Sequence, residues 1–209
     1  MRAIIFDLDG TLIDSLPDIA AAANHVLSKR GLPPLTIAQV KPMVGDGGRA
    51  LLSKAFAVYG QISGEDDYEV FETYYTAHAS ALTVIYPGIE EILQNLQAAG
   101  HRLGVCTNKP EAAARAVLHE LGLAGYFQTV MGGNSTPYRK PDPRHLAATL
   151  ASLNVDDAIM IGDHHNDLAA AEGLGLPAIF VSWGYGAAEH RHVAHAAQDI
   201  QTIIKNLAR

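Results

Sequence analysis

Two aspartates, Asp7 and Asp9, are separated by one residue and follow a short apolar run at residues 3–6. Alternate side chains of an extended backbone point to the same side, and Gly10 permits a sharp change of direction after them. The pair can present two carboxylates to one phosphate ester, one to attack phosphorus and one to move protons. Taken alone, the same pair would instead be an acidic turn that caps the next helix.

A second acidic group follows another apolar run, at residues 158–161. Asp163 and Asp167 are four residues apart, which places them on one helical face if a helix begins between them. Together with Asp7 and backbone carbonyl groups they form an oxygen-rich set suited to Mg²⁺. The structural alternative is that Asp163 caps a helix and Asp167 is a solvated residue within it.

A carboxylate that attacks a phosphate ester must overcome repulsion between like charges. This repulsion is roughly 4 kcal/mol per unit pair at close range, for an effective dielectric constant of about 20. Lys140 can compensate it, because Pro141 and Pro143 stiffen the loop around this cation before a helix begins. Thr107 and Asn108 add a hydroxyl and an amide where a helix N-terminus is expected, which suits phosphoryl oxygens. Each of these residues is unremarkable when taken singly.

Strands and helices that alternate along the chain are needed to bring these groups together. Short apolar runs predict strands at residues 3–6, 103–106, 129–131, 158–161 and 178–181. Helical patterns separate the later runs, at residues 88–99, 111–121, 143–153 and 165–174. The alternation predicts an α/β fold with a Rossmann-like parallel sheet and helices on both faces. Ligands of such sheets bind at the carboxyl ends of the strands, where the polar residues above are found.

One long stretch departs from this alternation. Residues 15–82 have helical patterns and no convincing strand, so we expect an all-helical cap domain inserted into the core. The α/β core domain would then comprise residues 1–14 and 83–209.

Composition limits the partners of this 209-residue chain. Its formal net charge of −7 and its lack of a Lys/Arg run argue against binding to nucleic acid or to an anionic membrane surface. A small phosphorylated metabolite remains possible, because a bound cation and a few lysines can reverse the potential within one cleft. Cys106 is the only cysteine, and no apolar leader or membrane-spanning stretch is found, so we expect a cytoplasmic protein. Whether it is a monomer or a homodimer is left open.

The four groups of polar residues occur in a characteristic order. They resemble the four motifs of the haloacid-dehalogenase-like superfamily over essentially the whole chain: Asp-x-Asp-Gly-Thr at 7–11, Thr-Asn at 107–108, Lys-Pro at 140–141 and Gly-Asp-x-x-x-Asp at 162–167. A helical insert after the first motif resembles the mobile cap of this superfamily. Dehalogenases of the superfamily lack an acid at the position of Asp9, so the resemblance implies a phosphatase.

The resemblance also implies a role for each motif residue. Asp7 would form an aspartyl phosphate, and Asp9 would protonate the leaving oxygen and then activate water. Mg²⁺ would be held by Asp7, Asp163 and the backbone carbonyl of Asp9. The remaining residues would serve the phosphoryl group: Thr107, Asn108 and Lys140 would bind its oxygens, and Asp167 would orient Lys140 or a metal-bound water.

Softer features bear on the substrate. Stretches such as 44–49, 86–88, 107–110 and 181–186 are similar to those of the bacterial phosphoglycolate phosphatases, which implies 2-phosphoglycolate as the substrate. Gly47, Gly48 and Arg49 of the insert would suit a small acidic leaving group, through bare backbone NH groups and a guanidinium. Alternatively, the glycines are a hinge and Arg49 is a solvated helix residue. Other small phosphate esters, a sugar phosphomutase and a non-catalytic phosphate-binding protein remain alternatives.

Overall fold

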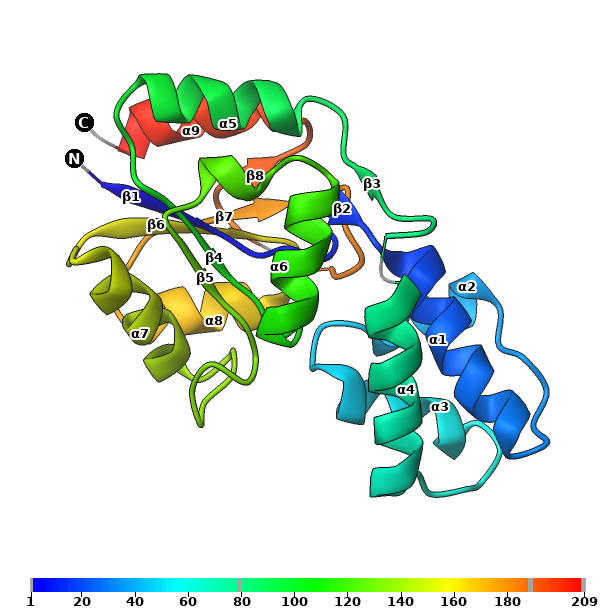
Figure 1. The fold of residues 1–209 in the computed structure, drawn as a ribbon. Coiled ribbons are helices and arrows are strands. Elements are labelled where there is room, and N and C mark those ends of the chain that lie inside the picture. Colours follow the sequence, from blue (N-terminus) through cyan, green and yellow to red (C-terminus); the bar gives the residue numbers. More distant parts are fainter. Residues whose placement is uncertain (1, 79, 188–189, 208–209) are drawn as a thin grey trace.

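A parallel sheet forms the centre of the computed structural model, which describes residues 2–78, 80–187 and 190–207. Six strands have the order β5-β4-β1-β6-β7-β8, and each neighbouring pair is parallel (Figure 1). They are β1 (Ala3–Phe6), β4 (Leu103–Cys106), β5 (Thr129–Met131), β6 (Ala158–Gly162), β7 (Ala178–Val181) and β8 (Val193–Ala194). The predicted α/β fold with a Rossmann-like sheet is confirmed.

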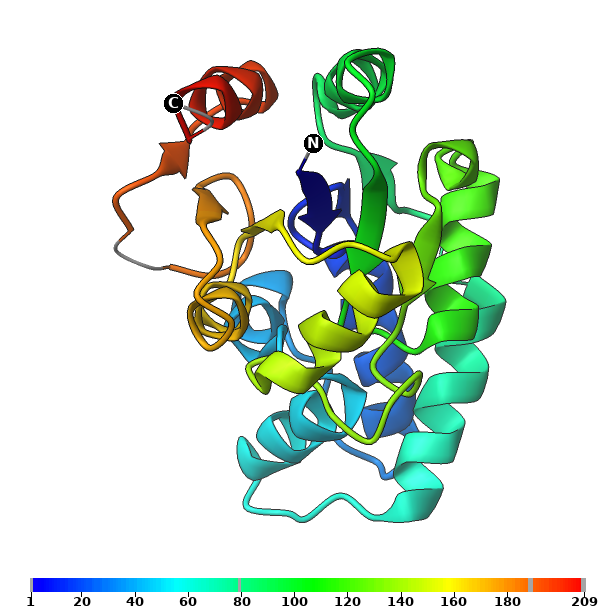
Figure 2. The same cartoon turned by 90° about the vertical axis from the view of Figure 1, so that its left-hand side faces the viewer.

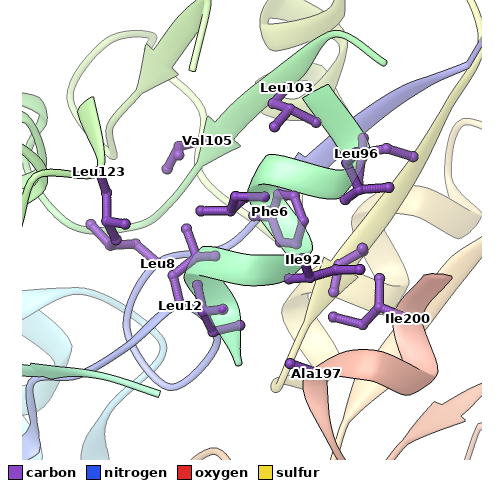
Figure 3. Close-up of a cluster of buried hydrophobic side chains, with 14 of the residues drawn as sticks. Phe6, Leu8, Leu12, Ile92, Leu96, Leu103, Val105, Leu123, Ala197 and Ile200 are labelled. Atoms are coloured by element: carbon purple, nitrogen blue, oxygen red, sulfur yellow. The ribbon is translucent and has the colours of Figure 1, made fainter. Parts of the chain in front are cut away.

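Strand β1 shows why the sequence has continuous apolar runs. Ile4 and Phe6 pack into one hydrophobic cluster and Ala3 and Ile5 into another, because alternate side chains point to opposite faces of the sheet. Figure 3 shows Phe6 among side chains of the first cluster. Burial of each large apolar side chain stabilises the fold by about 1.5–3 kcal/mol.

Helices cover both faces of the sheet. On one face, residues of α5 (Ile89–Ala98), α6 (Glu111–Glu120) and α9 (Ala197–Leu207) complete the first cluster. On the other face, α7 (Pro143–Leu153) and α8 (His165–Glu172) complete the second. Figures 1 and 2 show α5 and α9 side by side, with α7 and α8 across the sheet from them.

Four further helices lie beyond one end of the sheet (Figure 1). They are α1 (Leu16–Lys29), α2 (Ile37–Val40), α3 (Gly48–Ala57) and α4 (Glu65–His78), and a 3-10 turn, Lys41–Met43, follows α2. Their apolar faces form a third hydrophobic cluster, which contains Leu27, Leu52 and Phe56 and also includes Ala113 of α6. Between residues 15 and 78 the structure has no strand, as the sequence predicts. The domain boundaries at 14/15 and 82/83 stay a prediction.

Short elements add details that the sequence patterns do not reveal. Strands β2 (Ile13–Asp14) and β3 (Val84–Ile85) pair antiparallel, so the chain enters and leaves the four-helix region side by side. Two-residue strands are too short to show a periodicity. Strand β8, helix α9 and the 3-10 turn Ala124–Tyr126 are also absent from the prediction. Among the described helices, none is both long and apolar enough to cross a lipid bilayer.

Candidate active site

Three strands end together at the edge of the sheet that faces helices α1–α4. Phe6 at the end of β1 is paired with Val105 of β4 and with Ile161 of β6. The residues that follow these strands therefore emerge at one level, as expected for parallel strands. Asp7 follows β1, Thr107 follows β4, and Asp163 follows β6. The chain order thus brings the predicted motif residues together.

Asp7, Asp163 and Asp167 form an acidic cluster. One carboxylate oxygen of each lies within 4.8 Å of the others. Lys140 Nζ lies 2.9 Å from Asp7 Oδ1 and 2.6 Å from Asp167 Oδ1, and the lysine side chain is buried. The Asp167 contact is the one predicted for a residue that orients Lys140. Burial disfavours the lysine charge, but the carboxylates of Asp167 and Asp7 raise its pKa above the ordinary value.

The crowding of acids has an electrostatic consequence. Burial, and then the charge of Asp7 and of Asp167, raises the pKa of Asp163 to about 7. Burial also raises the pKa of Asp7 to about 6, although Lys140 opposes the shift. Both carboxylates therefore hold their charge poorly without a further cation. A divalent cation would relieve this repulsion.

The donor set fits a hard cation such as Mg²⁺. Asp7 Oδ1 is buried and accepts no hydrogen bond from a described residue, although Lys140 Nζ is close. Asp163 Oδ2 accepts hydrogen bonds from the backbone NH of Tyr185 and Gly186, at 2.7 and 3.2 Å, which hold its carboxylate in place. Carboxylate oxygens are the ligands that Mg²⁺ prefers. Asp167 joins Asp7 and Asp163 in this cluster, whereas the side chain of Asp9 lies outside it.

Glycines keep the space around the acids narrow. A Cβ added at Gly162 would overlap the Asp167 carboxylate, and one at Gly184 or Gly10 would overlap Asp163. These backbone segments can approach the carboxylates so closely only because they carry no side chain. The cluster is therefore a built cradle and not a loose collection of surface acids.

Asn108 organises two loops around the cluster. Its side-chain oxygen accepts from the Lys140 NH at 3.0 Å, and its Nδ2 donates to the Lys140 carbonyl at 2.9 Å. The same Nδ2 also donates to the carbonyl of Gly45, at 2.9 Å. Both amide atoms are thus engaged, so the predicted contact of Asn108 with a phosphoryl oxygen stays a prediction. Thr107 is buried next to Asn108 and borders a cavity at this site.

Helices α1–α4 reach the site through the loop before α3. The Gly45 carbonyl accepts a second hydrogen bond, at 3.2 Å, from Asn166 Nδ2, which also donates to Asp46 Oδ1 at 2.8 Å. Gly45 has φ +120° and packs against the ring of His164, where a side chain would collide. The loop is thereby fastened over the sheet edge.

A cavity of about 70 Å³ lies between this loop and the acids. Asp7, Asp9 and Asp163 border it from the sheet, and Gly47 and Gly48 border it from the loop. Its far wall is largely apolar, formed by residues that include Ile19, Leu51, Phe71 and Ala113. The structure therefore brings the predicted glycines to the predicted acids.

Arg49 is not part of that lining. Its guanidinium pairs with both carboxylate oxygens of Glu65 and stacks 3.9 Å from the ring centroid of Tyr68. The side chain is 48% exposed and borders a neighbouring depression that it shares with Arg139. In this arrangement Arg49 pairs with Glu65 as an exposed helix residue, and its predicted contact with substrate stays a prediction.

Two residues at the site were missed by the sequence analysis. Lys109 and Tyr75 both border the cavity, and Lys109 Nζ lies 2.9 Å from Asp9 Oδ1 and hydrogen bonds with the Tyr75 hydroxyl. Lys109 had one available signal, its position directly after Asn108. Tyr75 had none, because it belongs to an otherwise ordinary helical pattern.

Comparison with known proteins matches these features. A family model described as haloacid dehalogenase-like hydrolase matches residues 4–181. A phosphoglycolate phosphatase of Rhodospirillum rubrum is 45% identical over 194 residues, which cover 88% of this chain and 80% of that protein. One of Cereibacter sphaeroides is 39% identical over 199 residues, covering 93% of this chain and 91% of that protein.

Solved structures show the same architecture. The crystal structure of a predicted phosphoglycolate phosphatase from Haemophilus somnus superposes with a TM-score of 0.90, at 28% identity and 98% coverage of both chains. That of a predicted phosphatase from Clostridium acetobutylicum superposes with a TM-score of 0.85, at 27% identity and 98% coverage of both chains.

Proposed function

The chain belongs to the haloacid dehalogenase-like hydrolase family and is a phosphoric monoester hydrolase, and we propose that it hydrolyses 2-phosphoglycolate with Mg²⁺ through an aspartyl phosphate on Asp7. One observation carries the mechanism. Asp7 stands within a buried acidic cluster, in contact with Lys140, and borders a cavity that it shares with Asp9. A nucleophile, a counter-charge and a second carboxylate are therefore adjacent.

In the first step, a carboxylate oxygen of Asp7 attacks phosphorus, and the bond from phosphorus to the leaving oxygen breaks. Lys140 is suited to stabilise the charge on the phosphoryl oxygens, and Asp167 to fix the direction of its ammonium, 2.6 Å away. Asp7, Asp163 and the Asp9 carbonyl would hold Mg²⁺. When bound, the metal supplies positive charge that neutralises phosphoryl and carboxylate oxygens.

Asp9 is the residue we assign to proton transfer. It would donate a proton to the leaving oxygen, so that glycolate departs as the alcohol. It would then take a proton from the water that attacks phosphorus of the aspartyl phosphate, which releases inorganic phosphate and restores Asp7. The Asp9 side chain lies outside the acidic cluster and borders the cavity, which supports a role in proton transfer.

Residues 15–82, which contain helices α1–α4, would form a cap domain. The hydrogen bonds from Asn108 and Asn166 to the Gly45 carbonyl support closure of this cap over the sheet edge. Closure excludes bulk water from the attacked phosphorus until the leaving group has gone.

The assignment of 2-phosphoglycolate rests on the names of the relatives and on the small cavity. Gly47 and Gly48 would offer backbone NH groups to the glycolate carboxylate. The apolar wall around Leu51 and Phe71 instead favours a leaving group with a hydrocarbon part, so another small phosphate ester is the competing substrate. The acidic composition argues against nucleic-acid and anionic-membrane partners, and the single cysteine suits a cytoplasmic enzyme, which we propose to be a monomer or a homodimer.

Phosphate release from a panel of esters tests the proposal. We expect 2-phosphoglycolate to have the highest kcat/KM among small alkyl phosphates, with activity lost in excess chelator and restored by Mg²⁺. A tenfold higher kcat/KM for a sugar or nucleotide monophosphate would overturn the assignment of 2-phosphoglycolate as the substrate. Activity that persists in excess chelator would overturn the proposal that hydrolysis requires Mg²⁺.

A further inference from the structure

Lys109 is a buried cation at a junction between three parts of the chain. It lies in the loop before α6, its side chain is 2% exposed, and its Nζ is 2.9 Å from Asp9 Oδ1. The same ammonium hydrogen bonds with the Tyr75 hydroxyl and lies 4.4 Å from the centroid of that ring. Asp9 belongs to the sheet edge, whereas Tyr75 belongs to α4.

In the contact between Lys109 and Tyr75, the ammonium is the donor and the phenol oxygen is the acceptor. Burial raises the pKa of Tyr75 to about 12, so this residue is a neutral phenol at physiological pH and its oxygen can accept from the ammonium. A buried ammonium without partners is strongly disfavoured. The position of Lys109 is therefore fixed from both sides, by a carboxylate and by a phenol.

The donors to Asp9 leave one of its oxygens available. Lys109 Nζ and Ser15 Oγ, which lies 2.6 Å away, both bind Oδ1. Within the described residues no donor is found for Oδ2, and Asp9 borders the cavity. Because both donors bind Oδ1, Oδ2 is the oxygen left to interact with a leaving group in the cavity. This is the arrangement needed by a residue that hands a proton to a leaving oxygen.

We propose that Lys109 is a positioning residue that directs the Asp9 carboxyl toward the leaving oxygen, and that Tyr75 makes this placement depend on α4 lying against the sheet edge. The inference rests on the proposed function. Proton transfer to a poor leaving group would then require both the lysine and the docked helix. Esters with a good leaving group would need neither, because their alcohol departs without a proton.

Two other roles for Lys109 make different predictions. If the Lys109–Tyr75 contact only fastens α4, its loss lowers stability and reduces turnover of all esters alike. If Lys109 instead binds an anionic leaving group, its loss affects glycolate esters but not uncharged phenyl or alkyl esters. Neither role changes how the rate depends on the acidity of an uncharged alcohol.

The test compares kcat/KM for 4-nitrophenyl, phenyl and ethyl phosphate, a series in which the leaving alcohol becomes a progressively weaker acid. For a covalent mechanism kcat/KM reports the steps up to phosphoryl transfer, so breakdown of the aspartyl phosphate does not obscure the comparison. The variants are Lys109→Met and Tyr75→Phe. Tyr74→Phe is the control, because Tyr74 directly precedes Tyr75 in α4, stacks on His25 and His78, and does not line the cavity.

For Lys109→Met we expect kcat/KM to fall at least tenfold more for ethyl than for 4-nitrophenyl phosphate, since general acid catalysis contributes about 10²- to 10⁴-fold. Tyr75→Phe should change the series in the same direction by a smaller factor, and the double variant should resemble Lys109→Met. Tyr74→Phe should resemble the parent. Equal losses for all three esters, or no loss, would overturn the proposal.

Folding and the parent mechanism are checked separately. Tyr75→Phe removes a single oxygen, so it decides the question if Lys109→Met does not fold. A parent enzyme that hydrolyses neither 2-phosphoglycolate nor any ester in the series would refute the proposed function. A parent that hydrolyses all three, with variants that keep its leaving-group dependence, would refute only the role of Lys109.

Discussion

Lys140 Nζ, on a buried side chain, lies 2.9 Å from Oδ1 of Asp7, the residue that follows β1. The lysine thereby stabilises the ionised form of Asp7, whereas burial favours the protonated form. In the proposed reaction, the same ammonium compensates the phosphoryl charge as the ester approaches. Removal of the lysine should therefore impair both the stability of the fold and the reaction.

Lys140→Met should lower kcat by at least about 100-fold, as expected when a charge-stabilising group is removed. It should also destabilise the fold by about 3–5 kcal/mol, because Asp7 and Asp167 lose a buried partner. Steady-state kinetics and denaturant unfolding measure the two effects. Lys205→Met, at an exposed position of α9, is the control. Activity within tenfold of the parent would contradict the role of Lys140.

Magnesium should stabilise the protein, and more at pH 7.5 than at pH 5.5. The raised pKa values of Asp7, about 6, and Asp163, about 7, mean that the folded state binds protons more tightly than the unfolded state. Without metal, their contribution to stability is present below pH 4 and is lost as the pH rises toward 7. Mg²⁺ competes with these protons, so it binds best when both carboxylates are ionised.

Thermal unfolding measures this linkage. At pH 7.5 and a concentration 100 times the Kd at that pH, Mg²⁺ should raise the free energy of unfolding by about 2.7 kcal/mol. This corresponds to a rise in Tm of roughly 5–10 °C. The increase should shrink at pH 5.5. A larger increase at the lower pH would show that other groups hold the metal.

Gly162→Ala should impair the metal site, because the new Cβ would overlap the Asp167 carboxylate. We expect kcat to fall at least about tenfold and the Mg²⁺-dependent rise in Tm to shrink. Gly125→Ala is the control, since its Cβ would meet no atom within 4 Å. Unchanged metal response in Gly162→Ala would mean that the cradle is not required.

Arg49→Ala should change kcat/KM by less than about threefold for both 2-phosphoglycolate and 4-nitrophenyl phosphate. In this structure the guanidinium pairs with Glu65 and does not line the cavity. Loss of this exposed ion pair should also cost the stability of the fold only about 0–1 kcal/mol. A loss confined to 2-phosphoglycolate would instead show that Arg49 leaves Glu65 and binds the glycolate carboxylate.

The sequence predicts what local patterns determine. Strand β1 is recognisable because burial on both faces requires four consecutive apolar residues, and Asp7 follows directly after it. The sequence does not predict the direction of a side chain whose partner is distant along the chain. Arg49 turns to Glu65, 16 residues away on another helix, and Lys109 meets Tyr75 across 34 residues. No periodicity encodes such contacts, so the Asp9–Lys109–Tyr75 arrangement emerges only from the folded chain.

The central claim is that the Asp7 carboxylate carries the phosphoryl group during turnover. The direct measurement is an acid quench within milliseconds of mixing enzyme with substrate, followed by digestion and mass spectrometry of the peptide that contains Asp7. We predict a transient gain of one phosphoryl group at Asp7, and none in Asp7→Asn, which should be inactive. With 4-nitrophenyl phosphate, whose alcohol leaves without a proton, the gain should be greater in Asp9→Asn. Rapid turnover of substrate by Asp7→Asn, or a phosphoryl group on a different residue, would contradict the account.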